Sequence, residues 1–301
     1  MRWKFPEVIL DTREILKRVR RIEIRTNRLV NQSLAGQYHS VFKGRGMEFS
    51  GVREYILGDE IRTIDWNVTS RMGHLHVKKY VEERELTVVL LLDGSGSGEF
   101  GSRWRFKREL AAEVCALLAF SAIQNNDRVG LVLFTDQIEK YVPPRKGKNH
   151  VLRVIREALY FQPRSRGTDI RVALEHLIRT VTKRSVIFLI SDFLADGFEK
   201  ALGIANRKHD LIAVQIHDRR EAEIPNIGWM NLEDSETGET MLVDFSKRRV
   251  RQAFVRRAAE LEESRRRMFR SLNVDLIPLR TDQPYDLPLV SFFQKRARRL
   301  R

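Results

Sequence analysis

The sequence predicts an α/β protein with a doubly wound, mostly parallel sheet. Short apolar runs of strand length recur along the chain, as in "TVVLLLD" at 87–93, "VGLVLFT" at 129–135 and "VIFLI" at 186–190. Such runs are typical of strands that a parallel sheet buries on both faces. Segments with apolar residues at helical spacing separate these runs, and strands that alternate with helices form doubly wound sheets.

Each element of this series follows from a local pattern. Strands are predicted at 87–93, 129–135, 186–190, 211–217 and 274–280, and helices at about 104–124, 149–160, 169–182, 198–208 and 246–272. The segment "QIEKYVPPR" at 137–145 predicts an edge strand, because its prolines would interrupt a central ladder. The segment at 228–244 predicts a hairpin that turns at "SETG".

The chain divides into four predicted parts. Residues 1–33 are expected to form a basic amphipathic helix, and residues 34–86, rich in glycine and alternating charge, a small module of strands and turns packed on the sheet. Residues 87–285 are expected to form the main domain, with the hairpin inserted near 228–244, and residues 286–301 a basic C-terminal tail.

The net charge of +15 is concentrated at the two ends of the chain. Residues 1–33 hold 9 Lys and Arg against 4 Asp and Glu, and residues 246–301 hold 16 against 6. These flanks could contact an anionic membrane surface, nucleic acid or an acidic partner, or could be solvated helix faces. No apolar run reaches the roughly 20 residues of a membrane span, and no leader pattern is present, so we expect a cytoplasmic protein. The single cysteine, Cys115, lies in an apolar helical pattern and is expected in the core.

The loop after the first predicted strand allows two interpretations. Gly96, Gly98 and Gly101 match the Gly-x-Gly-x-x-Gly fingerprint of dinucleotide sites. That site needs an acidic residue about 20 residues further on, at the end of the second strand. Asp136, the nearest candidate, lies 35 residues after Gly101 and outside the apolar run, which argues against a dinucleotide. The Gly-x-x-x-x-Gly-Lys-Ser/Thr pattern of a P-loop does not occur in the sequence.

The second interpretation is a metal site. Asp93, Ser95 and Ser97 place oxygen side chains at alternating positions of the loop. Thr168 and Asp192 are expected at the same edge of the sheet, because the first precedes a predicted helix and the second follows a predicted strand. Two carboxylates and three hydroxyls suit Mg²⁺, with Mn²⁺ and Ca²⁺ as alternatives. Taken singly, each residue could instead be a turn or helix-cap residue.

Together these five residues resemble the metal-ion-dependent adhesion site of von Willebrand factor A domains, in which Asp-x-Ser-x-Ser is followed by Thr and then Asp. The block "GRGMEFSGVREYILGDEIRTIDWN" at 44–67 further resembles the bacterial family known as domain of unknown function fifty-eight. The resemblance covers roughly residues 30–220 and implies a sheet of the von Willebrand factor A type. It departs at Gly98, where relatives often carry methionine. It also implies a MoxR-type AAA+ ATPase as partner.

The block at 44–67 contains candidate partner-docking residues. They alternate in charge and include one tryptophan: Arg45, Glu48, Arg53, Glu54, Asp59, Arg62, Asp65 and Trp66. They could form a docking surface, or they could be paired within a structural module, where surface ion pairs add little stability.

The function expected from these patterns is a non-catalytic, Mg²⁺-dependent protein–protein interaction module. In it, an Asp or Glu of a client protein would complete the coordination of the ion. The resemblance implies chaperone-like assembly or metal insertion with the ATPase. A metal-dependent phosphate-ester hydrolase is an alternative, although no histidine accompanies the motifs as a general base. Nucleic-acid binding through the basic flanks ranks lower, because no aromatic platform for bases is evident.

Overall fold

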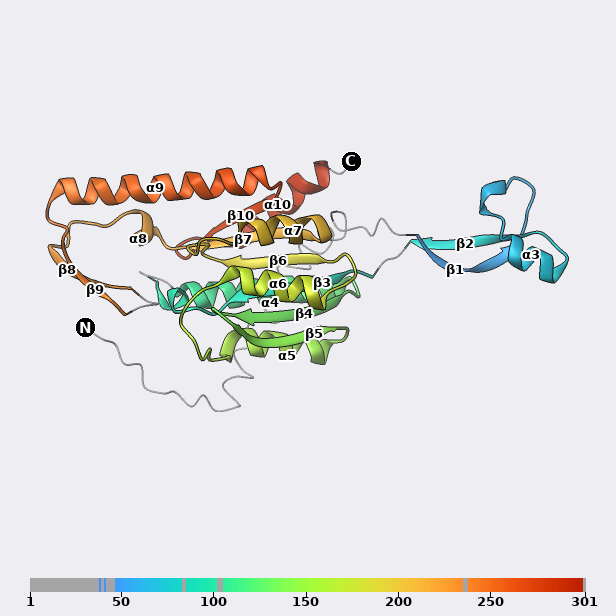
Figure 1. The fold of residues 1–301 in the computed structure, drawn as a ribbon, viewed down its shortest axis with the longest axis horizontal. Coiled ribbons are helices and arrows are strands. Elements are labelled where there is room, and N and C mark those ends of the chain that lie inside the picture. The colour runs from blue at the N-terminus through green and yellow to red at the C-terminus, as the bar shows by residue number, and fades with distance from the viewer. Residues whose placement is uncertain are drawn as a thin grey trace. The chain divides into compact units, whose positions relative to one another are not determined.

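The computed structural model describes residues 38, 41, 47–82, 85–101, 105–234 and 238–299 (Figure 1). The helix predicted at 1–33 lies outside these residues, as does Arg45. The chain forms two compact units, one comprising Met1–Val41 with Thr87–Arg301 and the other Phe42–Leu86. We call the first unit the body and the second the module.

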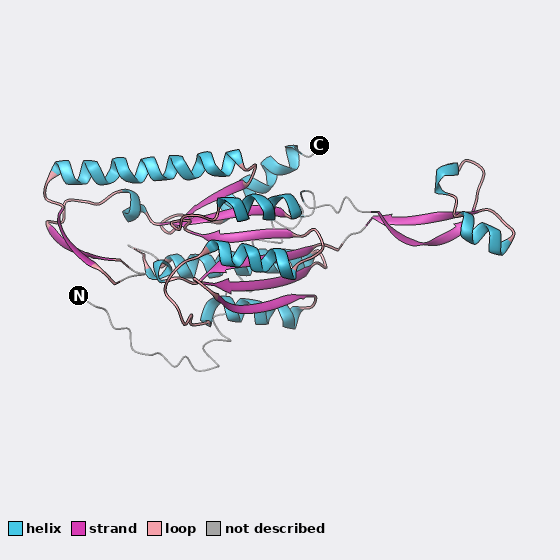
Figure 2. Cartoon of the chain, in the orientation of Figure 1, coloured by secondary structure: helices cyan, strands magenta, loops and turns pink. Residues whose placement is uncertain are grey.

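The body is built on a six-stranded, mostly parallel sheet, which confirms the predicted fold class (Figure 2). Its strands are β3 (Thr87–Asp93), β4 (Arg128–Phe134), β5 (Ile138–Arg145), β6 (Val186–Ser191), β7 (Asp210–His217) and β10 (Asp275–Arg280). Their order in the sheet is β10-β7-β6-β3-β4-β5, and only β5, at the edge as predicted, runs antiparallel to its neighbour. The chain moves outward from β3 to β4 and β5 and then returns to β6 on the other side. The boundary between β3 and β6 is therefore the point at which a doubly wound sheet opens a crevice for ligands.

Helices cover both faces of the sheet. They are α4 (Lys107–Gln124), α5 (Lys148–Tyr160), α6 (Ile170–Thr180), α7 (Glu199–Lys208), α8 (Arg219–Ala222), α9 (Arg248–Ser271) and α10 (Asp286–Arg299). Figure 1 shows α6 and α7 on one face of the sheet and α4 and α5 on the other. Val89 and Leu91 of β3 belong to the core under α6 and α7. Cys115 on α4 is fully buried, as predicted, and burial raises the pKa of its thiol.

The end of the body differs from the sequence prediction. The segment predicted as a basic tail from residue 286 forms helix α10 as far as Arg299, because Leu289 and Phe293 recur at a spacing of four and are both buried. The ring of Phe293 contacts that of Tyr38 edge to face, with 6.2 Å between centroids. Arg296 of the same helix bonds Asp210 and Asp275 at the ends of two strands. The basic residues of this helix are thus partly used within the fold.

A long excursion joins β7 to β10. It contains α8, the predicted hairpin as β8 (Trp229–Glu233) and β9 (Thr240–Asp244), and then α9. Only Phe269 of the 24 residues in α9 is buried, so most of this basic helix faces solvent. Among the described residues, no helix is long and apolar enough to cross a membrane.

The module is an antiparallel hairpin with a helical tip. Strands β1 (Met47–Glu54) and β2 (His76–Glu82) pair, and the 3₁₀ helix η2 (Ile61–Thr63) and helix α3 (Trp66–Met72) lie between them. The sequence predicts only strands and turns here, so α3 is a correction. Asp65 caps α3 by accepting hydrogen bonds from the amides of Asn67 and Val68, and Gly73 ends it in the left-handed conformation.

Candidate functional site

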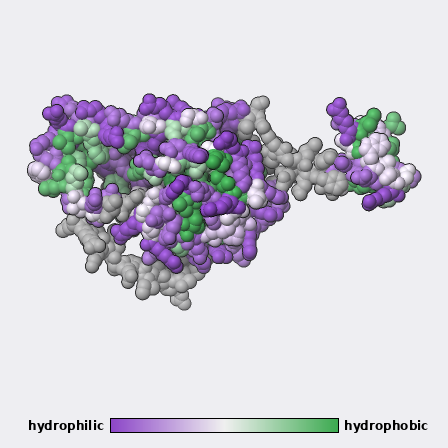
Figure 3. All heavy atoms as spheres, in the orientation of Figure 1, coloured by the Kyte–Doolittle hydropathy of each residue, from purple (hydrophilic) through white to green (hydrophobic). Residues whose placement is uncertain are grey.

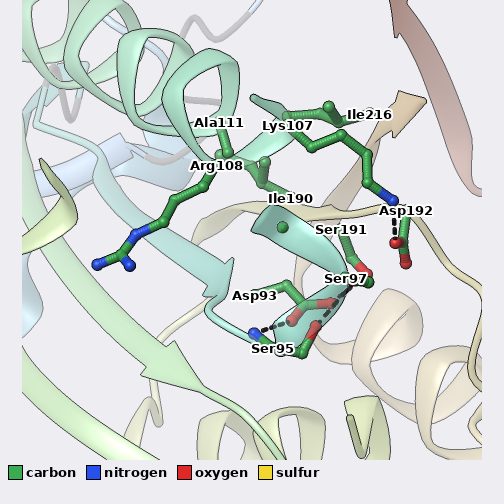
Figure 4. A pocket seen from close by; sticks show the side chains of 11 residues that line it. Asp93, Ser95, Ser97, Lys107, Arg108, Ala111, Ile190, Ser191, Asp192 and Ile216 are labelled. Atoms are coloured by element: carbon green, nitrogen blue, oxygen red, sulfur yellow. Dashed lines mark hydrogen bonds and ion pairs between the residues drawn. The ribbon is translucent and has the colours of Figure 1, made fainter. Parts of the chain in front are cut away.

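Two carboxylates end neighbouring strands at the switch point of the sheet. Asp93 is the last residue of β3, and Asp192 directly follows β6. The two strands are parallel and pair Leu92 with Ile190, so both carboxyl ends lie at the same edge. Figure 4 shows both side chains among those that line one pocket. The sequence analysis expected both carboxylates at this edge, because the carboxyl ends of parallel strands lie at the same edge of a sheet.

The loop after β3 turns two serine hydroxyls toward the same region. Ser95 Oγ and Ser97 Oγ lie 3.0 Å apart, and the amide of Ser95 donates to Asp93 Oδ1 at 2.9 Å. A short 3₁₀ turn, η3 (Gly96–Glu99), brings the two serines together. Gly101 closes the loop, since a Cβ there would lie 2.5 Å from the carbonyl oxygen of Arg105. Hydroxyls that bond each other rather than the nearby backbone argue against a simple turn role for Ser95 and Ser97.

A third serine, which the sequence analysis missed, holds Asp93 from the other strand. Ser191 Oγ donates to Asp93 Oδ2 at 2.6 Å, while the amide of Phe193 donates to Ser191 Oγ at 3.1 Å. The available signal was its place at the end of β6, immediately before Asp192. Each oxygen of Asp93 therefore has a donor, which fixes the orientation of the carboxylate.

The electrostatics of the pocket favour an added cation. Burial, followed by repulsion from Asp192, raises the pKa of Asp93 from 3.8 to about 6, against the opposing effect of the hydrogen bonds from Ser191 and Ser95. A carboxylate with a raised pKa is held in a charged state that its surroundings disfavour. A cation placed between the two carboxylates would offset both the cost of burying the charge of Asp93 and its repulsion by Asp192.

Part of that cation charge is already supplied by Lys107, which the sequence analysis also missed. Its Nζ lies 2.7 Å from Asp192 Oδ2 and 2.5 Å from Glu221 Oε1, and its side chain is buried. Burial would lower the pKa of Lys107, but attraction by Asp192 and Glu221 outweighs it and raises the pKa. Lys107 is the first residue of α4, where the helix dipole disfavours a cation. A lysine at this unfavourable position was the sequence signal that the residue pairs with a buried carboxylate.

Thr168 is not among the residues that line the pocket. Its loop is held at the same edge of the sheet by two backbone bonds, from Gly96 N to Arg166 O at 2.9 Å and from Asp169 N to Thr135 O at 3.0 Å. The cap of α6 is Asp169, whose carboxylate accepts from two amides, so Thr168 is not the helix cap. The place of Thr168 as a metal ligand remains a prediction.

Four of the side chains that line the pocket fit a hard divalent cation. Asp93, Asp192, Ser95 and Ser97 offer only oxygen, and Mg²⁺ commonly takes one or two carboxylates and keeps several waters. The described residues contain no cluster of three or more His, Cys, Asp and Glu side chains that could hold a metal. A site here would therefore depend on hydroxyls and water in addition to the two carboxylates.

Two exposed apolar side chains lie near the pocket in the chain. Phe100 follows η3 and is 43% exposed, and Leu194, two residues after Asp192, is 51% exposed. Both are tied to the site, since Lys107 N bonds Phe100 O at 2.9 Å and Leu194 N bonds Asp192 Oδ1 at 3.2 Å. The latter bond also gives Asp192 the turn-capping role that was considered for it. Exposed apolar side chains around a polar centre are typical of protein interaction sites.

The candidate docking residues of the module divide into two groups. Arg53 forms a bidentate pair with Asp59 at 2.7 Å for each bond, and Asp59 also accepts from the amide of Ile56 at 2.9 Å. The bonds from Arg53 and from the Ile56 amide lower the pKa of Asp59. These residues, like the cap Asp65, hold the hairpin tip. The backbone of Glu48 lies in β1, and its side chain is outside the described atoms.

The other docking candidates are free to contact a partner. Glu54 and Arg62 are exposed, and Trp66 is 64% exposed although it begins α3. Apolar side chains around the tip are exposed as well, with Ile56 at 64% and Leu57 at 98%. The docking role of this tip stays a prediction.

Comparisons with known proteins give a family but no activity. The family model described as "Protein of unknown function DUF58" matches residues 51–264. The uncharacterized protein Rv1480 of Mycobacterium tuberculosis is 29% identical over 293 residues, which cover 96% of this chain and 92% of that protein. Among solved structures, the conserved hypothetical protein BatB from Bacteroides thetaiotaomicron is 17% identical, with a TM-score of 0.44, over 71% of this chain and 99% of that one. A mussel byssus protein, proximal thread matrix protein 1, solved with a zinc-occupied MIDAS motif, is 17% identical, with a TM-score of 0.36, over 44% of this chain and 38% of that one.

Proposed function

We propose that this chain, which belongs to the DUF58 family of proteins of unknown function, is a non-catalytic module that binds partner proteins through a divalent cation. Asp93, Ser95, Ser97 and Asp192 would hold Mg²⁺ directly or through water, with Thr168 as a further ligand from the neighbouring loop. The observation that carries the proposal is the hydroxyl pair of the two serines beside two carboxylates that repel each other. Bound Mg²⁺ would supply a positive centre able to accept an outside oxygen ligand.

The partner group that fits this centre is a carboxylate. An Asp or Glu side chain gains a charge-assisted contact at the cation, and the exposed Phe100 and Leu194 give the surrounding chain apolar surface to cover. Lys107 supports the same preference, because its positive charge already offsets one of the negative charges at the site and the bound cation has less charge to neutralise. The cation then keeps more of its attraction for an incoming carboxylate.

We further propose a MoxR-type ATPase as the partner, with a client protein offering the acidic side chain. This step draws on the resemblance of the 44–67 block and the Asp-x-Ser-x-Ser loop. The exposed tip of the module, with Trp66 and Leu57, would provide a second contact surface for the ATPase. Coupled in this way, the pair would act in assembly or metal insertion.

The first experiment measures the cation. Full-length protein freed of metal by chelation is titrated with Mg²⁺, Mn²⁺ and Ca²⁺ by calorimetry, alongside Asp93→Asn and Ser97→Ala. Asp196→Asn is the matched control, since Asp196 is an exposed carboxylate in the loop after β6 and does not line the pocket. We expect binding in the wild type and the control only. Equal binding by all four proteins would refute the site.

The second experiment measures the partner. The purified MoxR-type ATPase of the same genome is tested for binding in Mg²⁺ and in chelator, with wild type and Asp93→Asn. Binding that requires both Mg²⁺ and Asp93 supports the proposal. Binding that survives chelation and the variant would leave the ATPase as partner but remove the cation from its recognition.

A further inference from the structure

A second candidate binding surface lies on the excursion between β7 and β10. An open groove of about 620 Å³ separates the segment after α8 from the first turns of α9. It is lined by three arginines, two apolar residues, a glutamine and a glutamate: Arg248, Arg251, Arg256, Ile224, Val255, Gln252 and Glu223. No ligand of the proposed cation lines this groove, so it is a separate surface.

The three arginines differ in what they do. Arg251 donates to the carbonyls of Phe245 and Ser246 at 2.5 and 2.7 Å, which anchors the start of α9 to the base of the hairpin. Arg248 and Arg256 form neither an ion pair nor a hydrogen bond with any described residue, and both are exposed. They lie eight residues apart on α9, about 12 Å along its axis. The groove thus presents two unpaired guanidinium groups at a fixed separation.

Apolar surface accompanies these charges. Val255 is 43% exposed within the groove, and Ile224 faces it from the segment after α8. The nearby hairpin exposes Trp229 and Met241, at 65% and 67%. Figure 3 shows hydrophobic side chains gathered over the hairpin end of the body, against the hydrophilic surface of α9. An occupant of this region must therefore combine negative charge with apolar side chains.

We infer that this groove binds an acidic segment of a partner protein that carries apolar side chains between its carboxylates. Carboxylates pair with arginine in charge-assisted bonds, often two at once, and the apolar side chains would cover Val255 and Ile224. A peptide fits better than a nucleic acid, because a row of phosphates would leave the apolar side chains of Val255 and Ile224 in the lining uncovered. A concave groove also suits a peptide better than the flat surface of a membrane does.

The groove adjoins the candidate metal site through α8. Glu221 of α8 bonds Lys107, which bonds Asp192, while Glu223 and Ile224 follow within three residues of Glu221 and line the groove. One acidic partner segment could therefore extend from the metal site into the groove. The arginine contacts themselves need no cation, so the inference does not depend on Mg²⁺ binding.

The test measures the binding of a labelled peptide to the full-length protein by fluorescence anisotropy in chelator. The probe is a short peptide of Glu and Leu, and its counterpart has Gln in place of every Glu. We expect the acidic peptide to bind and the neutral one to fail. Arg248→Glu combined with Arg256→Glu should weaken binding by about tenfold or more, since two charge-assisted contacts become repulsive.

The matched control is Arg249→Glu combined with Arg257→Glu, which changes the net charge equally on the same helix but outside the groove lining. We expect its affinity to stay within about twofold of wild type. Equal weakening by the two double variants would overturn the inference, because binding would then follow net charge alone. Tighter binding of a DNA duplex, or of phosphatidylserine vesicles, than of the acidic peptide would overturn it as well. Asp93→Asn should leave this binding unchanged, which separates the groove from the cation site.

Discussion

Replacing Asp93 by asparagine should stabilise the metal-free protein and abolish its response to Mg²⁺. The amide is nearly the same size as the carboxylate and can keep both hydrogen bonds. Its oxygen accepts from the amide of Ser95, and its NH₂ group can donate to Ser191 once that hydroxyl rotates. What changes is the charge, which burial and Asp192 disfavour.

The magnitude follows from the pKa of Asp93. Its rise from 3.8 to about 6 means that the folded protein disfavours the charged form by up to about 3 kcal/mol at neutral pH. The sign is fixed by linkage. Because the pKa is raised on folding, the folded state binds this proton more tightly, and the destabilisation grows as the pH rises from about 4 to about 6. Removal of the charge should raise the free energy of unfolding by roughly 1 to 3 kcal/mol, and the melting temperature by several degrees.

The assay is a thermal melt of full-length wild type and variant at neutral pH, in chelator and in Mg²⁺. We expect the variant to melt higher in chelator. We expect the wild type alone to gain stability with Mg²⁺, because a ligand that binds only the folded state stabilises it. A variant that melts lower than wild type in chelator would refute the electrostatic reasoning, and an equal gain in Mg²⁺ would refute the site.

Three further results are expected. Lys107→Met should lower the free energy of unfolding in chelator by about 3 to 5 kcal/mol, since Asp192 and Glu221 lose their buried cation. The same variant should bind Mg²⁺ more tightly when measured by calorimetry, and an unchanged affinity would show that Lys107 does not oppose the ion. Burial, and then nearby Lys208 and Arg184, lowers the pKa of His209 from 6.5 to about 4, so the free energy of unfolding does not depend on His209 above pH 6.5 and falls by up to about 3 kcal/mol as the pH drops toward 4. The melting temperatures of His209→Leu and wild type should therefore change differently with pH in this window and in parallel outside it. Asp65→Ala should cost the module about 1 kcal/mol and speed hydrogen exchange in Trp66–Met72, whereas unaltered exchange would deny the cap its role.

The strand pattern made most of the fold predictable. Runs such as 88–92 and 186–190 are apolar at every position because both faces of each strand are buried, and that pattern does not depend on distant residues. Helix α3 was missed because its seven residues carry too little periodicity, and its start depends on one capping carboxylate. The C-terminal helix was missed because its basic residues obscured two buried side chains, Leu289 and Phe293.

The sequence by itself determined that Asp93 and Asp192 each end a strand, and that serines follow the first of them, because strand ends follow from local patterns. Only the tertiary structure decided that these two strands are neighbours and which groups stand opposite the carboxylates. Lys107 reaches Asp192 across 85 residues of chain, and Ser191 reaches Asp93 across 98. Such pairings depend on how a helix packs over the sheet edge, and no local spacing records that. The charge balance of the site, and with it the affinity for a cation, is therefore a property of the folded chain.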